Sequence, residues 1–211
     1  MESYNNLADL LEEVALTSKK KPIRIKEILG KLERSGFSLI TLILVLPFMQ
    51  PFPVGPISVL GGMTFSMIGW QMWKGYSQPA LHSKILNMQL GFKVWDRIAK
   101  TFLIIIRWSN KISRARLPFL VMGQRGQKIE GGIFIIGGIL MAIPFGILPF
   151  NNFFPGLGIL FATLAQFEKD GLFILAAIFW LFFSILYFSV FFIGIYWLGF
   201  QGLQNFTSGM V

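Results

Sequence analysis

Apolar residues fill two long uncharged stretches of this chain, and prolines interrupt each stretch near its middle. The first stretch runs from Gly36 to Trp73 and the second from Gly131 to Gln166, and neither contains Asp, Glu, Lys or Arg. Each proline removes a backbone donor and disfavours a helical conformation in the residue before it. Each stretch is therefore predicted to form two helical arms around a break, and the repeated design predicts an internal repeat.

The predicted arms are short compared with a lipid bilayer. At ~1.5 Å per residue, arms 37–46 and 157–166 each span roughly 15 Å, about half of a ~30 Å hydrocarbon core. Arms 57–73 and 131–143 reach roughly 25 Å and 20 Å. Irregular backbone inside hydrocarbon must pack against protein or face water. The pattern therefore predicts two re-entrant or bent helical hairpins.

A third apolar stretch, from Leu172 to Phe200, contains neither proline nor charge. As one helix, residues 171–201 would extend roughly 46 Å, which exceeds the thickness of a bilayer core. The pattern fits one long tilted helix, or two short spans that bend within 184–189 or at Gly194.

Other regions mix apolar and charged positions at helical spacing. Residues 5–17 and 23–33 are predicted to form short amphipathic helices. Residues 77–116 combine Lys and Arg with Trp and Phe, without the ~20 uncharged residues that a membrane span needs. This pattern is typical of a helix at the membrane interface, and the alternative is a docking surface for a cytoplasmic partner.

These patterns predict an all-α integral membrane protein with five regions. They are the N-terminal amphipathic helices (1–35), the first broken hairpin (36–73), the basic amphipathic region (74–128), the second broken hairpin (129–170) and a C-terminal transmembrane helix or helix pair (171–211).

Composition and charge agree with a membrane location. Hydrophobic residues make up 54% of the chain, and its mean hydropathy is +0.64. All but one of the 19 Lys and Arg residues precede residue 129. Because cytoplasmic loops carry excess Lys and Arg, we expect a cytoplasmic N-terminus and hairpins that return to their starting side. The basic residues also favour anionic lipid headgroups as partners over nucleic acid.

The first 35 residues lack the apolar core of a secretory signal, so insertion into a bacterial inner membrane through the chain's own apolar segments is expected. The absence of cysteine excludes disulfides and thiolate chemistry. The apolar stretches contain no cluster of His, Asp and Glu, and His82 is the sole histidine. We therefore expect no enzymatic activity, no metal and no cofactor.

The breaks carry the candidate functional residues, because broken helices inside membranes expose amides and carbonyls that transporters use as binding sites. The candidate pathway residues are Pro47, Gln50, Pro51, Pro53, Gly55, Pro56, Ser58, Gln71, Pro144, Pro149, Asn151, Asn152, Pro155 and Gln166. Five charged residues are expected at the membrane interface, namely Glu33, Arg34, Arg116, Glu168 and Asp170. The alternative is that Pro and Gly only shape the hairpins while an Asn caps a half-helix.

Four motifs in order resemble the ExoD family of exopolysaccharide-synthesis proteins. They are Glu33-Arg34-Ser35-Gly36-Phe37, LPFMQPFPVGPISVLGG, Arg116-Leu117-Pro118 and PFNNFFPGLGILFATLAQFEKDG, and the resemblance covers about residues 25–175. Two positions depart from the family pattern: Phe167 replaces the usual leucine, and Asn151-Asn152 expands the usual Gly-Asn. The resemblance implies a bacterial inner-membrane protein connected with exopolysaccharide production and, in some members, with alkaline tolerance. It implies no mechanism.

Together these observations lead us to expect a small transporter or ion pathway, linked to exopolysaccharide synthesis and lined by the breaks at 47–58 and 144–155. A homodimer would complete such a pathway. The alternative is a non-transporting accessory or scaffold protein that binds lipid or the exopolysaccharide-synthesis machinery. An enzyme acting on lipid-linked sugar is disfavoured by the lack of a catalytic cluster.

Overall fold

A computed structural model shows a helical protein. It describes residues 13–14, 16–19, 21–24, 26–27, 35–50, 55–76, 79–80, 87, 89–114, 116–144 and 148–208. Its helices are α3 (Ser35–Val45), η1 (Leu46–Phe48), α4 (Pro56–Trp73), α6 (Phe92–Ile112), η2 (Pro118–Leu120), α7 (Gly123–Ala142), α8 (Phe153–Glu168) and α9 (Gly171–Ser208). The predicted all-α class is therefore confirmed, with one small addition.

That addition is a two-stranded antiparallel sheet in which β1 (Ile23–Arg24) pairs with β2 (Gln89–Leu90). The prediction of a helix starting at Ile23 is wrong at its first residues. Ile23 is β-branched, which suits a strand. It is buried and pairs with Leu90 of β2. Most of the predicted helix over 5–17 and of the segment 25–34 lies outside the described residues.

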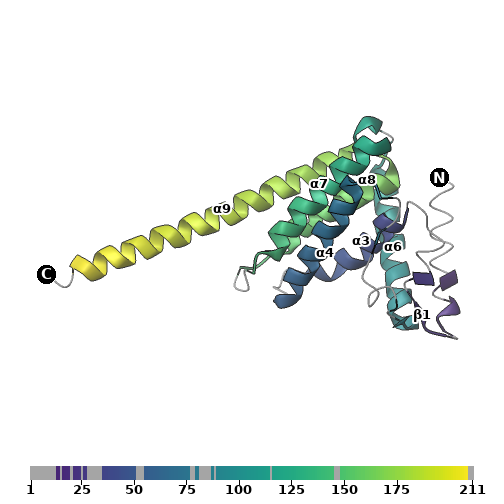
Figure 1. The fold of residues 1–211 in the computed structure, drawn as a ribbon, viewed down its shortest axis with the longest axis horizontal. Coiled ribbons are helices and arrows are strands. Elements are labelled where there is room, and N and C mark those ends of the chain that lie inside the picture. The colour runs from purple at the N-terminus through teal and green to yellow at the C-terminus, as the bar shows by residue number, and fades with distance from the viewer. Residues whose placement is uncertain are drawn as a thin grey trace.

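Helix α7 is central to the bundle, since it contacts α4, α8 and α9. Figure 1 shows α4 alongside α7, and this pair forms the most extensive contact between helices. Helix α3 packs mainly on α8 and touches α4 only slightly. Helices α3, α4 and α7 thus each pack chiefly on an arm of the other apolar stretch, whereas α8 packs chiefly on α9. The fully buried core side chains include Phe65, Ile68, Phe134, Met141, Ile159 and Ile174.

Helices α4 and α7 cross antiparallel with their backbones in contact. A Cβ atom added at Gly69 would lie 2.5 Å from the carbonyl oxygen of Gly131. One added at Gly138 would lie 2.5 Å from the carbonyl oxygen of Gly62. The glycines are seven residues apart on both helices, so they fall on one face of each. Small residues at such positions let two helices approach closely, as they do in membrane proteins.

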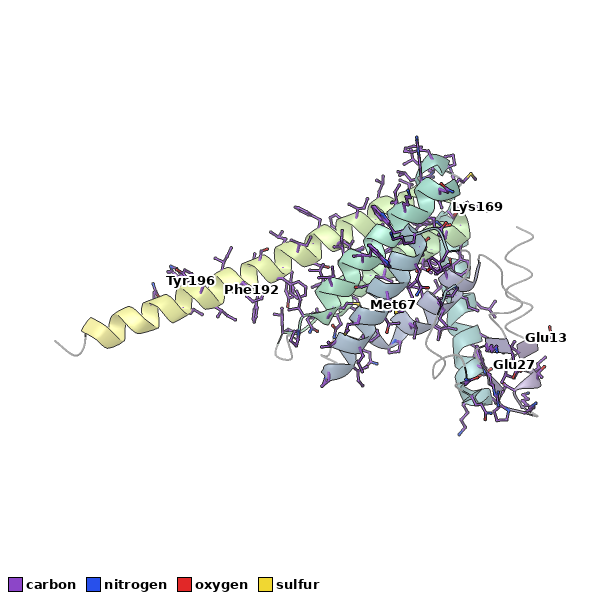
Figure 2. The ribbon with its side chains drawn as sticks, in the orientation of Figure 1. Glu13, Glu27, Met67, Lys169, Phe192 and Tyr196 are labelled. Atoms are coloured by element: carbon purple, nitrogen blue, oxygen red, sulfur yellow. The ribbon has the colours of Figure 1, made fainter. Side chains whose placement is uncertain are left out.

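Helix α9 is continuous, which decides between the two forms that the sequence allowed. Among the described residues, its segment Gly171–Gly199 is the one long and apolar enough to cross a membrane. The first half packs on α8, and the second half extends away from the bundle (Figure 1). Phe192 and Tyr196 lie on this extending half (Figure 2), where the large apolar side chains are exposed.

In the described part of the predicted basic region 77–116, residues 92–112 form the long helix α6, whereas Gln89–Leu90 form strand β2. Trp95 and Ala99 are buried, whereas Ile104, Trp108 and Ile112 are exposed at intervals of four residues. The exposed apolar positions therefore form one stripe on the helix surface. Whether this stripe contacts lipid stays a prediction.

Candidate functional site

The bundle has two chemically different ends. We call the end with Lys74, Arg125, Lys128 and Lys169 the charged end, where α3 and α7 begin and α4 and α8 finish. Lys169 marks this end in Figure 2. The opposite end, which we call the break end, holds the chain between α3 and α4 and the chain between α7 and α8. The predicted breaks therefore form the connections at one end of the bundle.

The two breaks meet at the start of α8. A Cβ atom added at Gly156 would lie 2.6 Å from the Met49 Cε atom and 3.8 Å from a Val45 methyl group. Gly156 thus permits η1 and the end of α3 to rest against the first turn of α8. Side chains of α8 and α9 hold the second break, since the Tyr187 hydroxyl donates to the Pro149 carbonyl at 2.7 Å.

The candidate residues of the first break are either exposed or bonded to nearby backbone where the structure describes them. Pro47, Gln50 and Pro56 are exposed. Ser58 is buried, and its hydroxyl donates to the Gly55 carbonyl at 2.7 Å, which closes the turn before α4. The two remaining prolines, Pro51 and Pro53, lie outside the described residues.

The second break buries its polar side chains. Pro144 and Pro149 are exposed, while Asn151, Asn152 and Pro155 are buried. Only 1% of Asn152 is exposed, yet its amide nitrogen and oxygen have no hydrogen-bond partner among the described residues. Leaving such a group buried and unsatisfied costs roughly 1–3 kcal/mol. A native protein retains this cost for a reason, and function is a common one.

The two glutamines at the ends of α4 and α8 differ in role. Gln71 donates to the Ala80 carbonyl at 2.9 Å and accepts from the Ala80 N–H at 2.7 Å. Both ends of that amide therefore hold the segment after α4. Gln166 donates to the Val121 carbonyl at 3.3 Å and also hydrogen-bonds to Glu130.

A cavity of about 340 Å³ lies at the charged end, and Glu130 belongs to its wall. Its lining residues are Phe37, Ser38, Met72, Gly75, Tyr76, Val121, Gly123, Gln124, Gln127, Glu130 and Gln166. Glu130 is 1% exposed, and its Oε1 atom has no hydrogen-bond partner in the part of the chain that the structure describes. The described residues contain no group of three or more His, Cys, Asp or Glu that could hold a metal ion.

Buried polar side chains occur at intervals along the contact between α3 and α8, from this cavity to the second break. Ser38 and Thr41 share one face of α3, and Asn152, Thr163 and Gln166 share one face of α8. We call these five residues the polar strip. Ser38 and Gln166 line the same cavity, while Gly156 rests on Val45 further along. Thr41 and Thr163, both fully buried, lie between these two contacts.

The charged residues predicted at the interface are partly structural. The Asp170 carboxylate accepts from the N–H groups of Arg114 and Leu172, each at 3.0 Å. The Gly171 N–H donates to the Arg116 carbonyl at 2.7 Å. Arg116 is exposed and Glu168 is buried, whereas Glu33 and Arg34 lie outside the described residues. Asp170 therefore ties the start of α9 to the segment after α6.

Replacing Asp170 with alanine is expected to lower the free energy of unfolding by about 1–3 kcal/mol, because two backbone donors lose their acceptor. The matched control is Asp96→Ala, which removes an exposed ion pair with Lys100 and should change stability by less than ~1 kcal/mol. Thermal unfolding in detergent measures both. Equal stability of the two variants would contradict the role assigned to Asp170.

Two comparisons with known proteins gave matches. A family model described as "Exopolysaccharide synthesis, ExoD" matches residues 7–190. Protein ExoD of Rhizobium meliloti (strain 1021) is 26% identical over 205 residues, which cover 97% of this chain and 85% of that protein. No solved structure matches.

Proposed function

Since the chain belongs to the ExoD family of exopolysaccharide-synthesis proteins, we propose that it serves this process as a small transporter or ion pathway in the bacterial inner membrane. In this proposal the chain crosses the membrane several times, and its N-terminus is cytoplasmic. The apolar segment of α9 supports a membrane location. The excess of Lys and Arg before residue 129 supports the orientation.

The observation that carries the proposal is the polar strip, which is buried in the contact between two apolar helices. Buried polar groups in membrane proteins are costly and commonly mark the route of an ion or substrate. The strip has Ser38 and Gln166 at the cavity beside Glu130, Thr41 and Thr163 in the buried contact, and Asn152 at the break end. Its members are thus spaced along the bundle between the two ends.

The packing of the arms supports a repeat of two hairpins. In a repeat, α7 would be the counterpart of α3, and α8 would be the counterpart of α4. The contact of α4 with α7 then has the contact of α8 with α3 as its counterpart. Both contacts occur, so each second arm packs on the first arm of the other hairpin. Pathways between two such repeats are common among secondary transporters.

Flux through reconstituted vesicles tests the proposal. Purified protein in lipid vesicles is expected to dissipate an imposed sodium, potassium or proton gradient faster than protein-free vesicles do, as reported by ion- and pH-sensitive dyes. Folded protein that moves none of these ions would overturn the ion pathway.

A non-transporting accessory role is the second candidate, and the surface of α6 favours it. Exposed Ile104, Trp108 and Ile112 lie on a helix that also carries exposed Lys93, Lys100 and Lys111. Such a helix suits the surface of an anionic membrane or a complex assembled there. Absence of flux together with binding to anionic vesicles would support this role.

A further inference from the structure

We propose that the cavity at the charged end binds a monovalent inorganic cation through the Glu130 carboxylate. This inference deepens the proposed function, on which it rests, by naming the class of ion that the pathway admits. The nearest polar groups of the strip, Ser38 and Gln166, line the same cavity. A cation released from Glu130 would therefore meet the strip directly.

Glu130 is almost completely buried. Desolvating a carboxylate is costly, so buried carboxylates are paired with a cation, bound to a metal or hydrogen-bonded. Here Gln166 provides a hydrogen bond, while Oε1 has no partner among the described residues. No Lys or Arg is among the residues that line the cavity. The carboxylate form of Glu130 would therefore draw its balancing positive charge from a bound cation.

The polar groups that line the cavity with Glu130 present oxygen atoms. The Gln127 Nε2 atom donates to the Tyr76 carbonyl at 2.9 Å, and the Gln166 Nε2 atom donates to the Val121 carbonyl. With their nitrogens engaged, the amide oxygens of both glutamines remain as acceptors. Ser38 and Gln124 add two further oxygens to the lining. Oxygen ligands suit hard cations.

The charge and the size of the cavity suit a monovalent cation. A single carboxylate among neutral oxygens carries one negative charge, which matches a cation of one positive charge. The cavity of about 340 Å³ is large enough for roughly ten waters at ~30 Å³ each, so the cation would retain part of its hydration shell. The nearby Arg125 and Lys128 are exposed, and salt screens exposed charges.

The experiment measures thermal unfolding of the full chain in detergent, in sodium chloride and in choline chloride at equal ionic strength. For the wild type, sodium at 100 times its dissociation constant is expected to raise the Tm by about 5 °C or more relative to choline. Glu130→Gln should abolish the difference. The matched control is Glu27→Gln, which makes the same change at an exposed position. This variant should keep the difference in Tm between sodium and choline.

A second variant covers the case in which Glu130→Gln fails to fold. Gln124 is exposed at the edge of the cavity, so Gln124→Lys is expected to fold and to place its own ammonium beside Glu130. This variant should lose the sodium-dependent rise in Tm. Gln89→Lys, at an exposed position on β2, should retain it.

The outcomes separate this inference from the proposed function. A wild-type Tm that is equal in sodium and choline, or a sodium effect that survives both Glu130→Gln and Gln124→Lys, would overturn the cation site. Dependence of Tm on pH without dependence on sodium would also overturn it, in favour of a proton on Glu130. Sodium-dependent stabilisation without any ion flux would support the site and contradict the pathway.

Discussion

Leucine at position 138 is expected to prevent α4 and α7 from packing and so to abolish the folded bundle. Gly138 lies against the carbonyl of Gly62 and the side chain of Ser66. Overpacking an ordinary core costs about 1–3 kcal/mol, because neighbouring side chains can still adjust. Here the obstacle includes the backbone of the other helix, which cannot rotate away. The whole contact would have to separate, and it is the largest in the bundle.

The measurement is the yield of monodisperse protein on size-exclusion chromatography in detergent, followed by thermal unfolding. Gly194→Leu is the matched control, since a Cβ atom at Gly194 would meet nothing within 4 Å. It makes the same change in another apolar helix and should leave both yield and Tm as in the wild type. A Gly138→Leu protein with wild-type Tm would show that the α4–α7 contact is unimportant for stability.

Leucine at position 152 is expected to abolish ion flux while preserving the fold. The Asn152 amide is buried without a partner among the described residues, so an apolar side chain of similar volume removes an unsatisfied group. Stability should therefore stay equal or rise by roughly 1 kcal/mol. Flux should fall by at least about tenfold, which corresponds to ~1.4 kcal/mol in the barrier. Opposite effects on stability and flux would mark a residue retained for function.

Asn87→Leu serves as the control for Asn152→Leu, because Asn87 is exposed and lies outside the bundle contacts described above. Flux is measured in the same vesicles at equal protein content. Wild-type flux in Asn152→Leu would remove Asn152 from the pathway.

The local helical pattern was readable from the sequence. Near the predicted positions, α4 begins at Pro56 and α7 ends at Ala142, before Pro144. The predicted starts of the other two arms were wrong, because α7 begins at Gly123 and α8 begins at Phe153 with Pro155 in its first turn, where a proline is tolerated. The continuous apolar stretch after Asp170 formed one helix. These features depend on local backbone preferences, which a sequence shows directly.

The partners of the arms were not readable, because they depend on contacts distant in sequence. Nothing in the pattern indicated that α3 would pack chiefly on α8, or that Gly62 and Gly138 would meet. Gln71 and Ser58 were predicted as pathway residues, yet their side chains bind nearby backbone. Whether they also serve a pathway stays a prediction.

Glu130 was overlooked as a functional candidate for a specific reason. It follows Lys128 at the boundary of an apolar stretch, where a charged residue usually indicates return to water. One signal was present, since it directly precedes a long stretch without charge. Its hydrogen-bond partner Gln166 comes from α8, more than thirty residues later in the sequence.

The length of α9 bears on how the orientation of this protein can be established. Buried residues of α9 are found up to Phe188, and from Val190 to Ser208 the helix continues for roughly 27 Å at ~1.5 Å per residue. A fluorescent protein or phosphatase fused to the C-terminus would therefore stand clear of the bundle. Its signal would identify the compartment in which the chain finishes while leaving the contacts of the other helices undisturbed.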